Sequence, residues 1–297
     1  MAKKPKILVI LGPTATGKSA LAIEIARKYN GEIISADSRQ VYIGLDIGTG
    51  KVTKKEMRGV PHHMLDIVSP KKVFSVAEWK KQAEEKIVDI LKRGKLPIIC
   101  GGTGFYIQSV VDNIMLPEVP PNKALRKKLE GKSAHELLKI LEKLDWRRAK
   151  EIEQKNPIRL IRAIEIAKTL GKVPNMQKNK SPYQFIQIGL TTNKEVLKKK
   201  INARLVARIK QGMIVEAKKL HTNRLSYKRM RSLGLEYKYL ANFLEKKISK
   251  QELVEKLDKE IYDYAKRQIT WFKRDKKIKW FDISEKNLEN KVLNFLK

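Results

Sequence analysis

The chain has little cysteine and no long apolar run, and both absences narrow what it can be. Its one cysteine is Cys100, which excludes an internal disulfide and a cysteine-based zinc site. No segment reaches the ~18 apolar residues that a membrane span requires. The first five residues, Met-Ala-Lys-Lys-Pro, do not resemble a signal peptide. We therefore expect a cytoplasmic protein that does not bind membranes.

Acidic residues are scarce relative to basic ones. The 297 residues include 65 Lys and Arg but only 32 Asp and Glu, which gives a formal net charge of +33. Nucleic acid is the expected partner, because each phosphate that binds a cation releases counterions. The alternative is a lysine-rich composition spread over solvated helix faces. The basic excess persists through the C-terminal half, which favours nucleic acid.

The most specific motif lies near the N-terminus. Residues 12–19 read Gly-Pro-Thr-Ala-Thr-Gly-Lys-Ser, a full match to the phosphate-binding pattern Gly-x4-Gly-Lys-Ser/Thr. The apolar run from Ile7 to Leu11 is typical of a buried parallel strand. Apolar residues at helical spacing follow from Ser19 to Tyr29. A plain glycine turn is the alternative, but the order strand, loop, helix favours phosphate binding.

The chemistry of this loop is anion capture by backbone N–H groups and by the positive end of the following helix. Lys18 adds a mobile positive charge, and the Ser19 hydroxyl is a candidate ligand of Mg²⁺. We therefore predict a site for phosphate or diphosphate with Mg²⁺ as cofactor. The loop residues are Gly12, Pro13, Thr14, Ala15, Thr16, Gly17, Lys18 and Ser19.

Strands and helices alternate over the first hundred residues. Glu32 to Ala36 and Leu96 to Cys100 are typical of short buried strands. Ser75-Val-Ala-Glu78 is a capping box that predicts a helix ending near Arg93. The alternation predicts an α/β fold with a P-loop NTPase-like core, in which helices flank a parallel sheet.

A charged helical segment interrupts this pattern. From Asn122 to about Lys172 the chain shows no clear strand. We therefore predict a P-loop α/β core of residues 1–117 and 183–297, with an inserted all-helical subdomain of residues 118–182.

Four further elements are expected in the second part of the core. Gln184 to Leu190 is typical of a strand, and Asn193 predicts the start of a helix that reaches Gln211. A capping box at Ser249 predicts a helix that reaches about Arg274. The last element, residues 279–283, is expected to be an edge strand.

Asp37 is the strongest candidate for chemistry outside the loop. It follows a predicted strand, and the carboxyl ends of parallel strands line the ligand crevice of an open α/β sheet. Asp37 is therefore a candidate general base or metal partner. The alternative is a helix N-cap, for which Asp is a favoured residue. Position alone does not separate the two.

Other candidates are weaker. The glycine-rich turn at 101–104 is either a second ligand-facing loop or a tight strand-to-helix turn. Asp66 and Asp89 are poor candidates for the metal-binding aspartate of ATP-hydrolysing proteins, because neither follows an apolar strand. His62 and His63 are adjacent, so their side chains point in different directions, which favours loop packing or a substrate contact over metal binding.

Several strings together resemble the tRNA dimethylallyltransferases, also called isopentenyl-tRNA transferases. They keep the family's order and span nearly the whole chain, and Asp-Ser-Arg-Gln-Val-Tyr after a phosphate loop is a specific combination. The absence of a C-terminal zinc module resembles the bacterial type. The matching strings are residues 12–19, 34–42, 46–49, 61–67, 101–106, 159–165 and 265–272.

The resemblance implies a reaction. The family transfers a dimethylallyl group from dimethylallyl diphosphate to the exocyclic amine of the adenosine 3′-adjacent to the anticodon. Asp37 matches the family's base, and Thr14 and Arg204 match positions that contact the diphosphate, so all three are implied to be catalytic. The loop would hold the donor's diphosphate with Mg²⁺ at Ser19.

The resemblance also implies a tRNA site. The helical insertion would grip the anticodon stem, and Thr103 matches a residue on the channel for the flipped base. Lys200, Leu235 and Asn156 depart from common family residues, which weakens individual RNA contacts. The positions implied to contact tRNA are Asp37, Ser38, Arg39, Gln40, Thr103, Arg126, Ile158, Arg159, Leu160, Ile161, Arg162 and Arg231.

Two rival functions use the same loop. One is a P-loop kinase that binds ATP and phosphorylates a nucleotide or small metabolite. The other is a non-catalytic, RNA-binding ATPase-like module. The sequence does not fix the oligomeric state, for which we expect a monomer.

Overall fold

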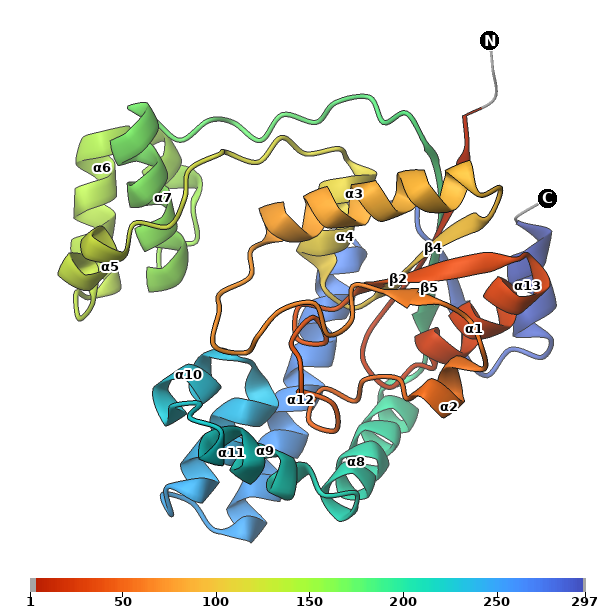
Figure 1. Ribbon diagram of the computed structural model, residues 1–297. Coiled ribbons are helices and arrows are strands. Elements are labelled where there is room, and N and C mark those ends of the chain that lie inside the picture. Colours follow the sequence, from red (N-terminus) through yellow and green to blue (C-terminus); the bar gives the residue numbers. More distant parts are fainter. Residues whose placement is uncertain (1–3, 296–297) are drawn as a thin grey trace. The chain divides into compact units, whose positions relative to one another are not determined.

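The computed structural model describes residues 4–295. In this part of the chain one six-stranded sheet has the order β3-β2-β4-β1-β5-β6, and all its strand pairs are parallel (Figure 1). The strands are β1 (Lys6–Leu11), β2 (Gly31–Ala36), β3 (His62–His63), β4 (Leu96–Gly101), β5 (Gln184–Thr191) and β6 (Lys279–Asp282). The predicted α/β fold with a parallel sheet is confirmed.

Successive residues of the central strand β1 point into two different hydrophobic cores. Ile7 and Val9 pack on the side that α3, α4 and α12 cover, and Leu8 and Ile10 pack on the side of α1 and α13. Both faces of the sheet are therefore buried, as expected for a parallel sheet. These helices are α1 (Lys18–Lys28), α3 (Val76–Lys92), α4 (Gly104–Val111), α12 (Lys250–Phe272) and α13 (Leu288–Asn294).

Local caps start the helices where the sequence predicts them. Ser75 and Ser249 each form a complete capping box with the glutamate three residues later. The Asn193 side chain accepts a hydrogen bond from the N–H of Val196 and caps α8 (Lys194–Lys210). The predicted strands and long helices are confirmed to within two residues at their ends, as differences in end assignment allow.

Several short elements were not predicted. The two-residue strand β3 pairs with β2 through Ile33 and Ile34 at the edge of the sheet. Helices α9, α10 and α11 follow α8 and pack with it and α12 around Leu205, Met230 and Leu240. The additional helices are α2 (Lys54–Met57), α9 (Met213–Thr222), α10 (Tyr227–Ser232), α11 (Leu235–Leu244) and α13.

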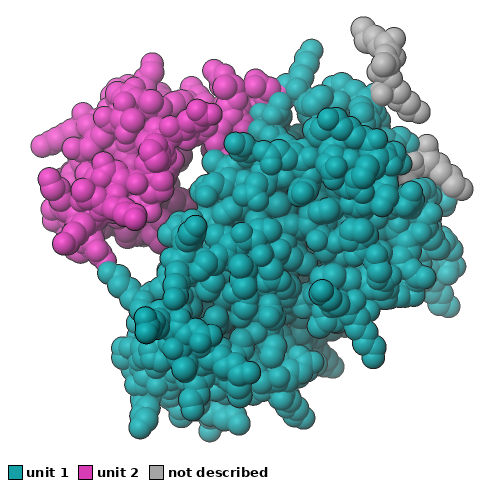
Figure 2. All heavy atoms as spheres, viewed as in Figure 1, with its two compact units in different colours: residues 1–113, 180–297 teal, residues 114–179 magenta. Residues whose placement is uncertain are grey.

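The chain divides into two compact units (Figure 2). Unit 1 comprises residues 1–113 and 180–297 and contains the sheet; unit 2 comprises residues 114–179. Unit 2 is all-helical, with a core around Leu141, Leu160 and Ile164. Its helices are α5 (Lys123–Leu129), α6 (Ala134–Glu151) and α7 (Pro157–Leu170).

None of the helices within residues 4–295 combines the length and the apolar character needed to cross a bilayer.

Candidate active site

The loop of residues 12–19 joins β1 to α1. Gly12 has a φ of +138°, and a Cβ atom there would lie 2.4 Å from the carbonyl oxygen of Leu190 on β5. Gly17, the N-cap of α1, is left-handed with a φ of +80°. Glycine is therefore required at position 12, where the neighbouring strand leaves no room for a side chain, and is favoured at position 17 by its left-handed backbone.

Lys18 folds back over the loop. Its Nζ atom donates a hydrogen bond to the carbonyl oxygen of Pro13 at 2.5 Å, and the Thr16 hydroxyl donates to the same oxygen at 2.9 Å. Burial is the main reason that the pKa of Lys18 falls to about 8; Arg204 also lowers it, whereas Asp37 raises it. A buried ammonium without a close anion binds a phosphate oxygen readily, because the anion compensates for its lost hydration.

Asp37 follows β2 directly, so it lies at the carboxyl ends of the parallel strands, as the phosphate loop does. Its Oδ1 atom accepts hydrogen bonds from the N–H groups of Arg39 at 2.8 Å and Gln40 at 3.4 Å. Residues 38–41 form a turn, so the helix N-cap alternative is wrong. Oδ2 has no hydrogen-bond partner among residues 4–295, which leaves one carboxylate oxygen able to accept a proton from a ligand.

A network of hydrogen bonds ties three strand ends together. The Thr103 hydroxyl, after β4, accepts a hydrogen bond from the N–H of Ser38 at 3.0 Å. Gln268 on α12 donates from Nε2 to the carbonyl oxygen of Gly102 at 2.9 Å, and its Oε1 accepts from the N–H of Thr14 at 2.9 Å. The turn at 101–104 therefore joins the phosphate loop to the segment that carries Asp37.

Arg204 reaches the loop from α8. One guanidinium nitrogen lies 3.4 Å from the Thr14 hydroxyl, and another donates to the carbonyl oxygen of Gly50 at 3.0 Å. Burial lowers the pKa of Arg204, and the nearby Arg208 lowers it further. The structure thus brings together Thr14 and Arg204, two of the three residues predicted to be catalytic.

The segment of residues 46–50 holds Arg204 in place. The Glu216 carboxylate on α9 accepts hydrogen bonds from the N–H groups of Asp46, Ile47 and Gly48, at 3.0, 2.7 and 2.9 Å. It also accepts one from the hydroxyl of Tyr237 at 2.6 Å. Glu216 therefore fixes the segment whose end, Gly50, accepts from Arg204.

The predicted tRNA-binding residues of unit 1 make contacts within this unit. Arg39 donates to the carbonyl oxygen of Ser232 at 3.3 Å, and the Gln40 side chain is 3.4 Å from the Ser35 hydroxyl. Arg231 donates to the Asn242 side chain at 3.1 Å and pairs with Glu245. Their predicted RNA contacts stay predictions.

In unit 2 the predicted arginines differ in what they contact. Arg126 and Arg162 both donate to the buried carboxylate of Glu165, with shortest distances of 2.6 and 3.3 Å. Their charges therefore stabilise this unit. Arg159 is more exposed and pairs at 2.9 Å with Glu153, which is about equally exposed.

The apolar positions next to Arg159 also differ. Ile158 is 81% exposed, whereas Leu160 is fully buried in the core of unit 2 and Ile161 is partly buried. Among these three, only Ile158 presents most of its side chain to solvent.

The histidine pair and the two doubtful aspartates form internal contacts. His63 lies 2.8 Å from the buried carboxylate of Glu32, and His62 lies 2.8 Å from the carbonyl oxygen of Val60. Asp66 pairs with Lys51 at 2.5 Å. Asp89 pairs with Arg93 at 2.8 Å along α3.

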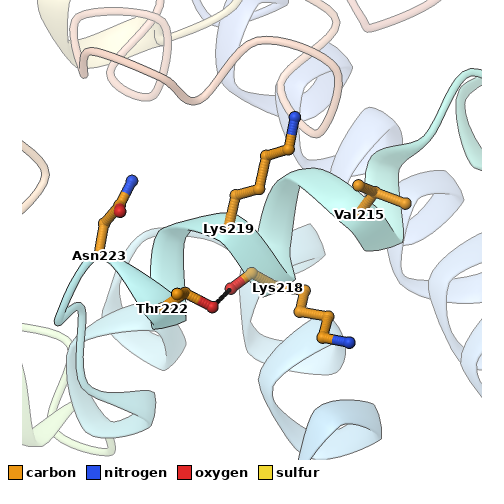
Figure 3. Close-up of a pocket in the computed structure, with 5 residues that line it drawn as sticks. All are labelled: Val215, Lys218, Lys219, Thr222 and Asn223. Atoms are coloured by element: carbon orange, nitrogen blue, oxygen red, sulfur yellow. Dashed lines mark hydrogen bonds between the residues drawn. The ribbon is translucent and has the colours of Figure 1, made fainter.

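Residues 4–295 contain no group of three or more His, Cys, Asp or Glu side chains that could hold a metal ion. A hollow on α9, drawn in Figure 3, contains none of the predicted site residues. Its lining consists of Val215, Lys218, Lys219, Thr222 and Asn223. The candidate site therefore lies at the carboxyl ends of the strands, where the phosphate loop and Asp37 are found.

Comparison with known proteins identifies the family. The family model for IPP transferases matches residues 40–275. A tRNA dimethylallyltransferase of Anoxybacillus flavithermus is 42% identical, over 97% of this chain and 94% of the relative. One of Carboxydothermus hydrogenoformans is also 42% identical, over 96% and 94%. The chain belongs to the tRNA dimethylallyltransferase family.

Solved structures of this family share the fold. A full-length tRNA isopentenylpyrophosphate transferase of Bacillus halodurans matches with a TM-score of 0.72 and 36% identity, over 98% of this chain and 94% of its own. A eukaryotic dimethylallyltransferase acting on tRNA matches with a TM-score of 0.80 and 25% identity, over 97% and 78%. The P-loop NTPase-like core predicted for this chain is the fold of these family members.

Sequence reasoning missed two residues, Gln268 and Glu216, whose hydrogen bonds organise the candidate site. Gln268 lies inside the string 265–272, but the motif gave it no role. Glu216 lies in α9, where no pattern was recognised, and its partner segment matched the family only as a string at 46–49. A polar residue on the buried face of a predicted helix was the available signal for Gln268.

Proposed function

We propose that this chain transfers a dimethylallyl group from dimethylallyl diphosphate to the exocyclic amine of the adenosine 3′-adjacent to the anticodon of tRNA. One observation carries the proposal: the phosphate loop, Arg204 beside it and Asp37 lie together at the carboxyl ends of the strands. Family membership supports the same reaction, because the relatives are named for it.

The donor's diphosphate would bind the phosphate loop. The N-terminus of α1, the Lys18 ammonium and the Arg204 guanidinium provide positive charge there. Charge accumulates on the diphosphate as the bond to the allylic carbon breaks. These groups are therefore most favourable when the leaving group departs.

Asp37 would act as the base. The nitrogen attacks the allylic carbon as the carbon–oxygen bond breaks, and diphosphate leaves with the electron pair. The adenine amine is a weak nucleophile, because its lone pair is delocalised into the ring. As the new bond forms, the nitrogen gains positive charge and its N–H becomes more acidic. Its proton then passes to the carboxylate oxygen of Asp37 that is not engaged in the turn.

The residues present fit a Mg²⁺ ion held mainly by diphosphate oxygens and water. Ser19 offers one hydroxyl at the start of α1, and no dedicated carboxylate cluster is found within residues 4–295. Mg²⁺ commonly uses few protein ligands and several phosphate oxygens. When bound, it would neutralise negative charge on the leaving group.

The tRNA would bind through phosphate contacts and shape, with the target base flipped out of the anticodon loop. The net charge of +33 and the exposed Arg159 of unit 2 support this partner. With tRNA as the substrate, we expect the reaction to take place in the cytoplasm.

The experiment is a transfer assay with purified protein, Mg²⁺, unmodified tRNA and labelled dimethylallyl diphosphate. We expect label on the adenosine next to the anticodon, located by nuclease digestion. A parallel reaction with labelled ATP tests the kinase and ATPase alternatives. Label absent from tRNA, together with hydrolysis of ATP or transfer of its γ-phosphate, would overturn the proposal.

A further inference from the structure

Gln268 is a buried polar side chain that the proposed mechanism does not use. It lies on α12 and is 7% exposed. Its Oε1 atom accepts from the backbone N–H of Thr14, and its Nε2 atom donates to the backbone carbonyl of Gly102, both at 2.9 Å. One amide thus links the loops that follow β1 and β4, two neighbouring strands.

The chemistry of this link requires an amide. The N–H of Thr14 needs an acceptor and the carbonyl of Gly102 needs a donor. A carboxylate of the same length could serve only Thr14, and an apolar chain could serve neither. The approach is close, because a Cβ atom on Gly102 would lie 2.2 Å from Nε2. Glycine at this position leaves room for the amide.

The link continues on both sides to the reacting groups. Thr14 is in the phosphate loop and lies 3.4 Å from Arg204. Thr103 follows Gly102, and its hydroxyl accepts from the N–H of Ser38, the residue after Asp37. A hydrogen-bonded path therefore runs from the diphosphate side of the site, through Gln268, to the side of the base.

We propose that Gln268 is a positioning residue that sets the spacing between the phosphate loop and Asp37. The inference rests on the proposed prenyl transfer, in which the attacking nitrogen, the allylic carbon and the leaving oxygen must be in line. Donor and tRNA each bind mainly to one side of the link. Losing the link therefore leaves both bound but misaligned, and misplacement by ~1 Å costs about 100-fold in rate.

The experiment compares Gln268→Met with Gln187→Met in steady-state transfer assays. Gln187, on β5, is also buried, and its Nε2 atom donates a hydrogen bond to Asp275 at 2.8 Å. The substitution to Met removes this one bond, which does not involve the loops. We expect Gln268→Met to lower kcat by about 10- to 100-fold, with little change in the KM for the donor or the Kd for tRNA. Gln187→Met should lower the melting temperature but leave kcat unchanged.

A second variant tests the chemistry of the link. Gln268→Glu keeps the acceptor for Thr14 but turns a carboxylate toward the Gly102 carbonyl and adds negative charge near the diphosphate. It should lower kcat and, unlike Gln268→Met, also raise the KM for the donor. If Gln268→Met does not fold, Gly102→Ala displaces the same amide from the other side and should lower kcat in its place.

The outcomes separate this inference from the proposed function. If the wild type does not prenylate tRNA, the proposed function fails first. If the wild type is active and Gln268→Met retains its kcat, the positioning role is wrong. A rise in the donor KM with unchanged kcat for Gln268→Met would also overturn it, because Gln268 would then be a donor-binding residue.

Discussion

At the scale of single residues, Asp37 has a structural contact, the hydrogen bond from the Arg39 N–H, and a proposed role as the base. One substitution removes the second and keeps the first. Asp37→Asn keeps an Oδ1 acceptor for the N–H of Arg39 but cannot take up a proton. We expect kcat for prenyl transfer to fall by at least about 100-fold, while tRNA binding, measured by filter binding, stays unchanged. A large loss of tRNA affinity with little loss of kcat would assign Asp37 to recognition.

The ammonium of Lys18 predicts how donor binding depends on pH. Its pKa of about 8 in the free protein lies below the usual range, mainly because of burial. Bound diphosphate stabilises the charged form and raises this pKa, so above pH ~8 binding must take up a proton. Donor affinity should therefore fall as pH rises through about 8.

Calorimetric titration with dimethylallyl diphosphate in buffers of different ionisation enthalpy measures this proton uptake. Lys18→Met is the control, and its weaker affinity should lack the pH dependence. The same dependence in wild type and variant would place the titrating group elsewhere.

At the scale of elements, the amino ends of β2 and β4 and the short strand β3 gather around a buried carboxylate. Glu32, 2% exposed, lies 2.8 Å from His63 and 2.7 Å from Lys95, and is paired with Arg93. The hydrogen bond from Arg93 is the main reason that the pKa of Glu32 lies well below its usual range. Glu32 thus stabilises the fold above the unfolded-state pKa of ~4.3, and this contribution is lost as pH falls below that value.

Replacing this carboxylate leaves the charged side chains of Arg93 and Lys95 without their anion. We expect Glu32→Gln to lower the free energy of unfolding by about 3 kcal/mol near neutral pH, as measured by denaturant unfolding. The difference in unfolding free energy between the variant and the wild type should be smaller at a pH about one unit below the usual glutamate pKa of ~4.3. A difference that is the same at both pH values would contradict the role of the charge.

The contact between α9 and the segment of residues 46–50 predicts a different effect. Glu216→Gln replaces one carboxylate oxygen by an NH2 group, which cannot accept a hydrogen bond from a backbone N–H group. We expect a loss of about 1–3 kcal/mol in stability and a higher KM for the donor, because Gly50 no longer fixes Arg204. Tyr237→Phe, which leaves the backbone contacts intact, should have the smaller effect on KM.

The elements that sequence reasoning found share one property, a complete local signal. Capping boxes at Ser75 and Ser249 and the apolar runs of β1 and β4 determine their structures within a few residues. The strand β3 has only two residues and forms through pairing with β2, which no local pattern reveals. Helices α10 and α11 are short; α10 packs on α11, and α11 packs on α12, so tertiary contacts outweigh their weak local preference.

The site shows the same division. The phosphate loop was predictable because its motif carries its own geometry. The position of Asp37 at the carboxyl end of a strand was predictable. Whether it is a site residue or a helix N-cap was not, because only the turn that its carboxylate closes excludes the N-cap. The partners of Gln268 lie 166 and 254 residues away in sequence, so no local pattern could predict them.

At the scale of the whole molecule, the excess of positive charge predicts strongly salt-dependent tRNA binding. Each lost phosphate contact should reduce the slope of log K against log salt concentration by about 0.7–0.9. Arg159→Ala should reduce the slope by about this amount, with a smaller effect on kcat. Lys28→Ala, which removes a charge paired with Glu289 on α13, is the control and should leave the slope unchanged. Equal slopes for Arg159→Ala and wild type would remove Arg159 from the RNA contacts.

The cysteine content has a practical consequence for studying the two units. Cys100 is buried, and burial raises the pKa of its thiol to about 11, so few molecules carry the reactive thiolate at neutral pH. The wild-type chain is therefore a nearly silent background for thiol labelling. One cysteine introduced on α6 and another on α1 can carry a fluorophore pair or two spin labels without altering Cys100. Comparing the distance between the labels with and without tRNA would then test whether the separation of the two units changes on binding.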